Sequence, residues 1–520
     1  MKAKLVLCPW FRVLPLGLAT VGLTQPSCKP SSEYAHLDVT MTLANLTPEQ
    51  RALVHDIVIE SQVDGNKDPT RIHRVSFVPA QLDKSFATSF DYIPDPQSGK
   101  FVVTAVLSDK TSKQLAKQSK DTEVSPKSTA HVSFDFDSAG LMSGPCKLEM
   151  DATELTPNPD WGLSVNLLWD GDHYLVIYDD KAQGDGDLAS VKLDANGKAI
   201  SPPVFINSSP KVSTLPSIIK DGNGYVVAWQ EGELDDQPPV SVDIRRLDAN
   251  GAPVGNIREI ATASPEARPV LASAYGKIAL TWMDDRGTAT MPDRISYVAY
   301  LKSDDFSFEQ SPLLLVPPSQ PPGAQNAFPA LSMNGQSLAV SWVNASQTVY
   351  TANLSDALAL SPPLQLYTSM FIAQQLGVVS TGDQLFTAWE DLSGDIDKGR
   401  ERIHGVFSTS AGALGAGGYV HDIDTGSANW PRMAWSGTSV ATVYYQYRTF
   451  GSQIYLTREN TKGERIDGMD IQLTDVAGEA KYPQIVFRGN DLSGDHFGLG
   501  FVSDHTGKQR AYFAPVVCSQ

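Results

Sequence analysis

Apolar and polar residues alternate in short segments between residues 36 and 137, which is the spacing of strands with one buried face. The clearest segments are at residues 37–43, 55–61, 74–78, 101–107 and 130–136. Turn-forming clusters such as residues 64–69 separate them. About seven short strands in about 100 residues is typical of a small two-sheet sandwich. We therefore expect a β-sandwich over residues 36–137, followed by a flexible linker of small residues at 138–145.

The pattern changes after residue 146 into a repeat with one aromatic residue per unit. The aromatics are Tyr178, Trp229, Trp282, Trp342, Trp389, Tyr444 and Phe501. A glycine stands seven residues before six of them, and six residues before Trp282. A proline stands 13 residues before four of them, at Pro216, Pro269, Pro329 and Pro431. A period of about 50 residues indicates a repeat architecture.

The second unit shows what each repeat contains. Two apolar segments flank the turn DGNG, the second being the uninterrupted YVVAW, and two further strand segments flank the turn LDANG. Four antiparallel strands per unit predict a propeller blade, with the aromatic filling the space between neighbouring blades. Leucine-rich solenoids have shorter repeats, and tandem sandwiches have longer ones.

The seventh unit lacks one strand, because only residues 509–518 follow its aromatic strand. An additional strand segment at residues 146–152 precedes the first unit. We predict that this segment completes the last blade and closes the ring, which leaves no edge unpaired. Cys146 and Cys518 would then lie on neighbouring strands and form a disulfide in an oxidising compartment.

Residues 1–27 have the pattern of an export signal. Lys2, Lys4 and Arg12 are basic, and residues 13–23 form an apolar run too short to span a bilayer. Cys28 follows Ser27 in a segment that resembles a bacterial lipobox, although Gln25 and Pro26 depart from that pattern. The resemblance implies lipid attachment at Cys28, a tether at residues 28–35, and an outer-membrane lipoprotein. The alternative is a plain secretory signal and a secreted protein.

Charge and composition exclude several classes of function. The chain has 520 residues and a formal net charge of −18, which disfavours nucleic acid as a partner. Its 41% hydrophobic content is enough to build folded cores. The sequence contains neither the GxSxG motif of serine hydrolases nor the HExxH motif of zinc enzymes. No catalytic residue and no metal ligand can be assigned from motifs.

Acidic residues follow most of the repeat aromatics. The candidate ligand-binding residues at this rim are Asp180, Glu231, Asp284, Asp285, Glu390, Asp391 and Asp504. Such a rim can bind a cation, a basic ligand or a sugar. The alternative is that these side chains cap backbone NH groups in turns. The segment DLSGD occurs twice and resembles the start of a Ca²⁺ loop, but its glycine is misplaced, so we expect no cofactor, with Ca²⁺ as the alternative.

The glycine and aromatic-x-Asp/Glu pattern of residues 146–520 resembles that of secreted bacterial β-propeller proteins. Residues 36–137 resemble the Ig-like modules of bacterial surface lipoproteins. These resemblances imply an all-β chain, with an Ig-like sandwich followed by a seven-bladed propeller closed by an N-terminal strand.

Two functions are consistent with this architecture. The first is a noncatalytic cell-envelope platform that binds a glycan, peptide or protein. The second is a hydrolase or lyase that acts on a glycan or lactone at the channel mouth. Convergent carboxylates or an arginine cluster in the axial funnel would favour the enzyme. We expect a monomer that meets the membrane only through its lipid anchor.

Overall fold

The computed structural model describes most of the chain from residue 35 onward. The described ranges are 35–45, 56–63, 73–77, 85–92, 100–108, 114–123, 129–137, 146–156, 164–180, 186–232, 240–263, 266–285, 294–316, 326–334, 337–345, 347–369, 372–392, 401–409, 411–421, 426–448, 451–467, 470–476, 478–491 and 494–518. The predicted signal peptide, Cys28 and the predicted linker lie outside these ranges. Within them, no helix combines the length and apolar character needed to cross a membrane.

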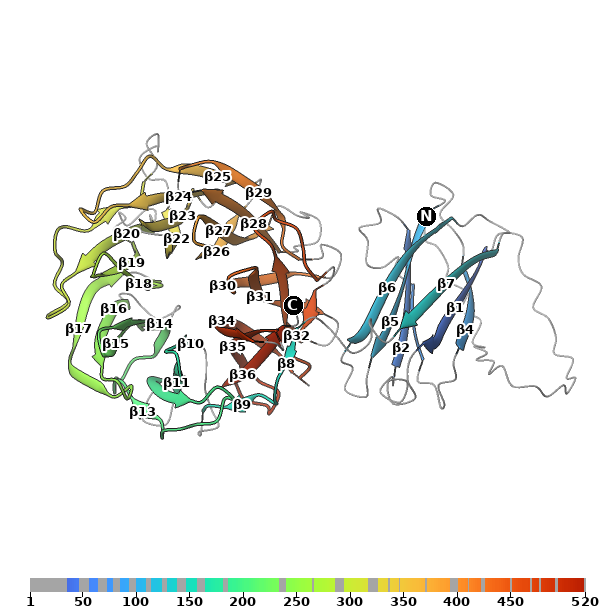
Figure 1. The fold of residues 1–520 in the computed structure, drawn as a ribbon, viewed down its shortest axis with the longest axis horizontal. Helices are drawn as coiled ribbons and strands as arrows, with labels where there is room; N and C mark the ends of the chain where they lie inside the picture. Colours follow the sequence, from blue (N-terminus) through green and yellow to red (C-terminus); the bar gives the residue numbers. More distant parts are fainter. Residues whose placement is uncertain are drawn as a thin grey trace, which may run out of the picture. The chain divides into compact units, whose positions relative to one another are not determined.

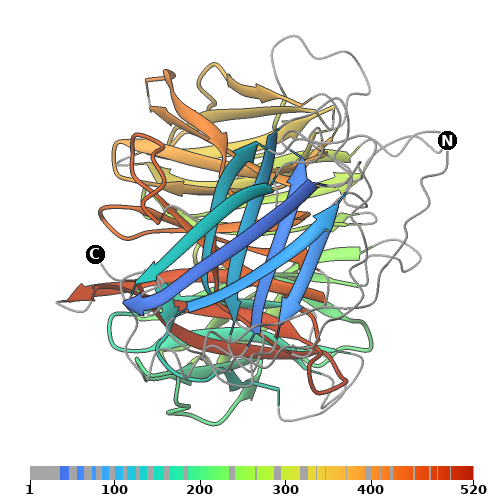
Figure 2. The same cartoon turned by 90° about the vertical axis from the view of Figure 1, so that its right-hand side faces the viewer.

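The chain divides into two compact units, Met1–Gly144 and Pro145–Gln520, here called unit 1 and unit 2. The described residues of unit 1 form two β-sheets (Figure 2). One sheet has the order β4 (Ser85–Tyr92), β1 (Ala35–Asn45) and β7 (Thr129–Asp137). The other has the order β3 (His73–Phe77), β2 (Asp56–Val63), β5 (Lys100–Ser108) and β6 (Gln114–Glu123). Leu37, Val39, Met41 and Leu43 are all buried, so the alternation in β1 does mark its buried face.

Unit 2 contains seven successive sheets within its described residues. The first three are β10 (Val165–Trp169), β11 (Tyr174–Asp180), β12 (Asp187–Leu193) and β13 (Val204–Phe205); β14 (Ser213–Asp221), β15 (Gly224–Glu231), β16 (Val240–Leu247) and β17 (Pro253–Ala263); and β18 (Val270–Ala274), β19 (Lys277–Asp285), β20 (Arg294–Leu301) and β21 (Leu313–Leu314). The fourth and fifth are β22 (Asn326–Asn334), β23 (Ser337–Asn344), β24 (Thr348–Leu354) and β25 (Leu364–Thr368); and β26 (Ala373–Ser380), β27 (Gln384–Asp391), β28 (Arg402–Thr409) and β29 (Leu414–Tyr419). The last two are β30 (Ala428–Trp435), β31 (Val440–Arg448), β32 (Gly451–Glu459) and β33 (Ile471–Gln472); and β34 (Ala480–Asp491), β35 (Gly494–Ser503), β36 (Arg510–Cys518) and β8 (Cys146–Leu148).

These sheets are arranged around a central axis as a β-propeller (Figure 1). Each sheet contributes its first strand to the centre, and each central strand contacts the central strands of the sheets before and after it, including β34 with β10. The short turns are formed as predicted: β14 ends at Asp221, β15 begins at Gly224, and Gly222 between them has a φ of 60°.

The repeat aromatics fill the space between sheets, as predicted. Trp229, Trp282, Trp342 and Trp389 are fully buried. Trp229 belongs to a cluster that includes Leu175 of the preceding sheet. Large apolar side chains therefore pack one sheet of the propeller against the next.

The predicted completion of the last sheet by an upstream strand is confirmed. Strand β8 pairs antiparallel with β36, and Cys146 lies opposite Cys518 in that register. The two cysteines form a disulfide across 372 residues of sequence. Strand β9 (Thr153–Glu154) also pairs with β36, so two segments from upstream complete the last sheet.

Candidate functional site

The central strands carry an unusual backbone feature at one common position. Strands β14, β22, β26, β30 and β34 are each bulged near their start. Non-glycine residues at or next to these bulges, and at the matching position before β18, have positive φ: Leu215 (53°), Arg268 (43°), Phe328 (52°), Gln375 (53°), Trp430 (60°) and Tyr482 (54°). We call these six residues the bulge ring. Such a conformation costs about 1–3 kcal/mol per residue, and strain of this kind is typical of functional sites.

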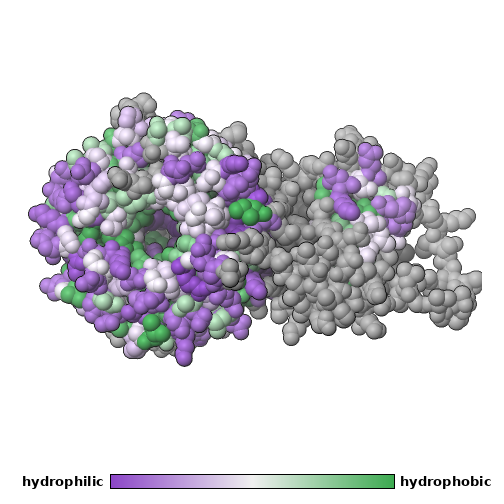
Figure 3. Space-filling view, viewed as in Figure 1, coloured by the Kyte–Doolittle hydropathy of each residue, from purple (hydrophilic) through white to green (hydrophobic). Residues whose placement is uncertain are grey.

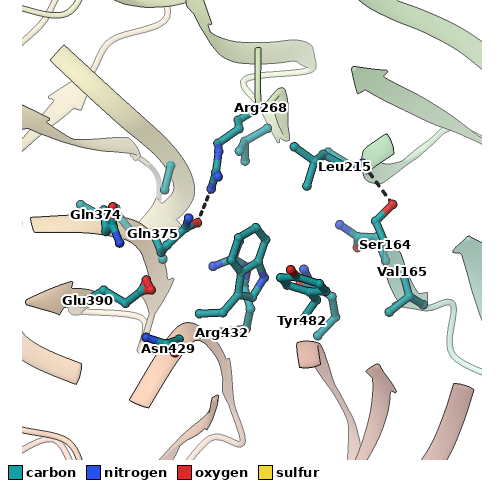
Figure 4. A pocket seen from close by; sticks show the side chains of 18 of the residues that line it. Ser164, Val165, Leu215, Arg268, Gln374, Gln375, Glu390, Asn429, Arg432 and Tyr482 are labelled. Atoms are coloured by element: carbon teal, nitrogen blue, oxygen red, sulfur yellow. Dashed lines mark hydrogen bonds between the residues drawn. The ribbon is translucent and has the colours of Figure 1, made fainter. Parts of the chain in front are cut away.

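Five residues of the bulge ring, all except Phe328, line a cavity of about 680 Å³ at the centre of unit 2. Figure 3 shows unit 2 hollowed at its middle. Figure 4 shows that Leu215, Arg268, Gln375 and Tyr482 reach this space from different parts of the ring. The volume is within the range of small-molecule sites, about 300–1,000 Å³. The sequence signal for the ring was the repeat proline, because five of the six residues directly precede Pro216, Pro269, Pro329, Pro431 or Pro483.

Two arginines line the same cavity. Arg268 donates from Nε to Glu266 and from Nη1 to the side-chain oxygen of Gln375, which fixes its orientation (Figure 4). Arg432 donates from Nη1 to the Pro431 carbonyl oxygen at 2.7 Å. Both guanidinium groups lie over the ring of Trp430, at 5.0 and 4.9 Å from its centroid. Burial, together with repulsion from Arg268, lowers the pKa of Arg432 to about 9, so it remains charged at neutral pH.

Two carboxylic groups also line the cavity, Glu390 near the end of β27 and Glu401 just before β28. Glu390 lies opposite Ile403 in the antiparallel register, so Glu401 is its diagonal neighbour on the same face. Diagonal neighbours are about 7–8 Å apart, within reach of long side chains. Asn429 donates its side-chain NH to Glu401.

The two carboxylic groups differ in their environments. Glu390 is only 4% exposed. Burial, reinforced by the charge of Glu401, raises the pKa of Glu390 to about 8 against the opposing effects of Arg268 and Arg432. Glu390 is therefore mostly protonated at neutral pH, which suits a proton donor.

Aromatic side chains form the adjoining wall. Tyr482 lies between Trp430 and Tyr445, with ring centroids 5.1 and 5.8 Å away. Tyr447 continues the cluster, 5.6 Å from Tyr445. Burial raises the pKa of Tyr445, and the carboxyl of Glu390 adds to that effect, so the phenol stays protonated at neutral pH. Faces of this kind are suited to the apolar C–H faces of sugar rings.

Three buried polar atoms of this wall have no hydrogen-bond partner among the described residues. They are Glu390 Oε2, Asn429 Oδ1 and Trp430 Nε1. Each unmet buried group costs about 1–3 kcal/mol, and native structures rarely leave several together. Similar atoms occur elsewhere among the described residues, as at Tyr178 and Trp282, so here they identify polar groups that a ligand in the cavity can contact.

The rim residues predicted from the sequence are distributed differently. Glu390 lines the cavity, whereas Asp180, Glu231, Asp284, Asp285, Asp391 and Asp504 are absent from its lining. Glu231 accepts hydrogen bonds from Ser213 Oγ and Trp229 Nε1, and Asp504 accepts one from the Glu479 backbone NH. Asp391 accepts a hydrogen bond from Ser369 Oγ at 2.6 Å. Asp285 ends β19 opposite Arg294.

The described residues contain no cluster of three or more His, Cys, Asp or Glu side chains that could hold a metal ion. Sequence reasoning missed Arg268, Arg432, Glu401 and the aromatic wall. Arg268, Arg432 and Tyr482 belong to three different repeats and share no motif, so only the folded ring brings them together.

The chain has structural similarity to known proteins but no sequence-level match. No protein-family model matches it, and no curated protein matches it. The α-L-arabinanase of Penicillium chrysogenum, solved with arabinobiose, is similar with a TM-score of 0.38 and 13% identity over 58% of this chain and 92% of that one. Polysaccharide lyase Uly1 has a TM-score of 0.42 and 6% identity over 70% and 90%. The β-propeller domain of the trilobed protease from Pyrococcus furiosus has a TM-score of 0.38 and 8% identity over 69% and 95%. At these identities the likeness concerns the fold alone.

The expectation of a noncatalytic binding platform is wrong. The similar structures include arabinofuranosidases, an arabinanase, a family-43 glycoside hydrolase and a polysaccharide lyase. The cavity contains the two features that the sequence analysis named as favouring an enzyme, namely paired carboxylic groups and two arginines. A platform would instead have presented small apolar and backbone groups in the funnel.

Proposed function

We propose that this chain cleaves a glycan in the central cavity by acid–base chemistry. The observation that carries the proposal is the pair of carboxylic groups, Glu390 and Glu401, in one cavity but in different environments. Glycoside cleavage requires one carboxylic acid that can give up a proton and one carboxylate that can act as base or nucleophile. Environments that separate the two pKa values assign these roles.

Glu390 is assigned the role of proton donor to the leaving oxygen of the glycosidic bond. Its burial keeps it protonated at neutral pH. Glu401 is assigned the role of base or nucleophile, because it lines the same cavity and Asn429 donates a hydrogen bond that orients its carboxyl group. The aromatic wall of Trp430, Tyr445 and Tyr482 is assigned to sugar-ring binding.

The test is the isosteric variant Glu390→Gln, which keeps the shape but cannot donate an acidic proton. We expect the full chain to release reducing ends from at least one member of a panel of plant, algal and bacterial polysaccharides. We expect Glu390→Gln to lower that rate by about 100-fold or more, the contribution of a general acid. Product analysis separates hydrolysis from elimination, because elimination leaves a new carbon–carbon double bond.

Glu459→Gln is the matched control. Glu459 is also buried, and burial raises its pKa to about 7, but it does not line the cavity. Its substitution should leave the rate unchanged. No cleavage of any polysaccharide by the wild-type chain, or full activity in Glu390→Gln, would refute the proposal.

The finer architecture and location belong to the same proposal. We take the seven sheets of unit 2 as seven blades of a closed propeller, and unit 1 as an Ig-like spacer. The basic and apolar pattern of residues 1–27 supports export, with Cys28 as a lipid attachment site or the chain secreted freely. Such a protein would meet its glycan outside the cytoplasm.

A further inference from the structure

Arg432 has a charge that the described protein does not neutralise by direct contact. None of the described ion pairs includes it, and its hydrogen bond goes to the neutral carbonyl of Pro431. A guanidinium has five N–H donors, and the described hydrogen bond of Arg432 uses one of them. Arg432 is partly exposed where it lines the cavity, so an anion that enters this space can pair with its charge.

Arg268 is fixed close to Arg432. Glu266 and Gln375 hold its guanidinium, and it stacks between Phe328 and Trp430 at 5.0 Å from each ring centroid. Because Trp430 lies against both guanidinium groups, the two like charges are held near each other in a confined space. An anion between or beside them would relieve their repulsion.

We propose that the cavity binds an acidic sugar, a uronic-acid unit of a glycan, and that Arg432 and Arg268 hold its carboxylate. This inference rests on the proposed function, because it names the substrate class of the same site. The planar guanidinium fork matches a carboxylate bidentately, as a lysine could not. Trp430 and Tyr482 lie beside the arginines, so the sugar ring that bears the carboxylate can stack while its charge is paired.

The net charge of the chain, −18, does not exclude an acidic ligand. At physiological ionic strength, charges more than about 8 Å from the ligand are largely screened. A buried pair at contact distance is screened much less. The groups that line the cavity, among them Arg432 and Arg268, therefore decide its preference for a charged ligand rather than the distant acidic surface.

The test measures binding apart from turnover. In the Glu390→Gln background, isothermal titration would compare oligosaccharides of galacturonate, mannuronate and glucuronate with their carboxyl-reduced counterparts. We expect at least one uronate oligosaccharide to bind, and its reduced counterpart to bind about 10- to 100-fold more weakly. Adding Arg432→Gln should cause a similar loss for the uronate alone, with partial recovery in Arg432→Lys. Arg258→Gln is the matched control, because Arg258 lies on β17 and pairs with Asp305 outside the cavity.

Thermal unfolding of each variant verifies that it is folded. Equal binding of uronate and carboxyl-reduced oligosaccharides, or no effect of Arg432→Gln, would overturn the inference. Binding of sulfated oligosaccharides that lack carboxylates, in place of uronates, would overturn the assignment of the carboxylate. Cleavage of neutral glycans without uronate binding would sink this inference and leave the proposed function intact. Uronate binding without cleavage of any glycan would support this inference and refute the proposed function.

Discussion

Replacing Glu390 by Gln should stabilise the protein at alkaline pH while it removes activity. In the folded chain the pKa of Glu390 is raised from 4.5 to about 8 by burial and by the charge of Glu401. The unfolded chain therefore loses this proton first, and wild-type stability falls as pH rises between these two values. A pKa that differs by one between the folded and unfolded chains corresponds to about 1.4 kcal/mol of unfolding free energy. The raised pKa of Glu390 therefore lowers the unfolding free energy of the wild type by about 3 kcal/mol at neutral pH and by about 5 kcal/mol above pH 8.

The glutamine variant does not ionise and escapes this cost. The assay is urea unfolding of wild type and Glu390→Gln from about pH 5 to about pH 9, with the difference in unfolding free energy plotted against pH. We expect the difference to grow in favour of the variant until about pH 8. Glu459→Gln should show the same sign but reach its plateau near pH 7, because the pKa of Glu459 is raised by burial only to about 7. Parallel curves for wild type and Glu390→Gln would refute the view that this carboxyl is held protonated.

Two further predictions concern the closure of the last sheet. Cys146→Ser should lower the unfolding free energy of unit 2 by up to about 6 kcal/mol relative to the oxidised wild type, which is the loop-entropy value for a bridge across 372 residues. Denaturant unfolding measures this loss, and reduced wild type is the comparison. His496 contacts Glu149 at 2.5 Å and Asp491 at 3.0 Å. Burial acts to lower the pKa of His496, but the hydrogen bonds to these two carboxylates outweigh burial and raise that pKa. The folded state therefore gains stability that is complete below the ordinary histidine pKa and is lost as pH rises through the raised value. His496→Gln should remove that pH-dependent part, which amide hydrogen exchange of β8 and β36 would detect.

The ring and the completion of its last sheet could be predicted because they depend on features repeated along the chain. Trp229, Trp282 and their equivalents mark the same buried position in each sheet, and apolar size alone specifies that role. Counting strands left the last unit one short and identified residues 146–152 as the donor. The pairing of Cys146 with Cys518 then followed from strand adjacency.

The chemistry of the cavity could not be predicted in the same way. Glu390 was identified as an acidic rim residue, but its raised pKa depends on burial and on Glu401 across the hairpin. Glu401 precedes β28 and follows no repeat rule. Arg432 has no equivalent charge in the other repeats at its position, so nothing periodic indicated it.

The bulge ring explains how one repeated fold can hold a site that is not repeated. In five of the six positions a proline directly follows the strained residue, and five of the six side chains line the cavity, all except that of Phe328. Leu, Arg, Phe, Gln, Trp and Tyr occupy six such positions, so the scaffold constrains the backbone but not the side-chain chemistry. Six residues with positive φ together cost several kcal/mol of folding free energy, and packing of the core does not require this conformation. The conformation has a function if the variable side chains recognise the ligand of the cavity.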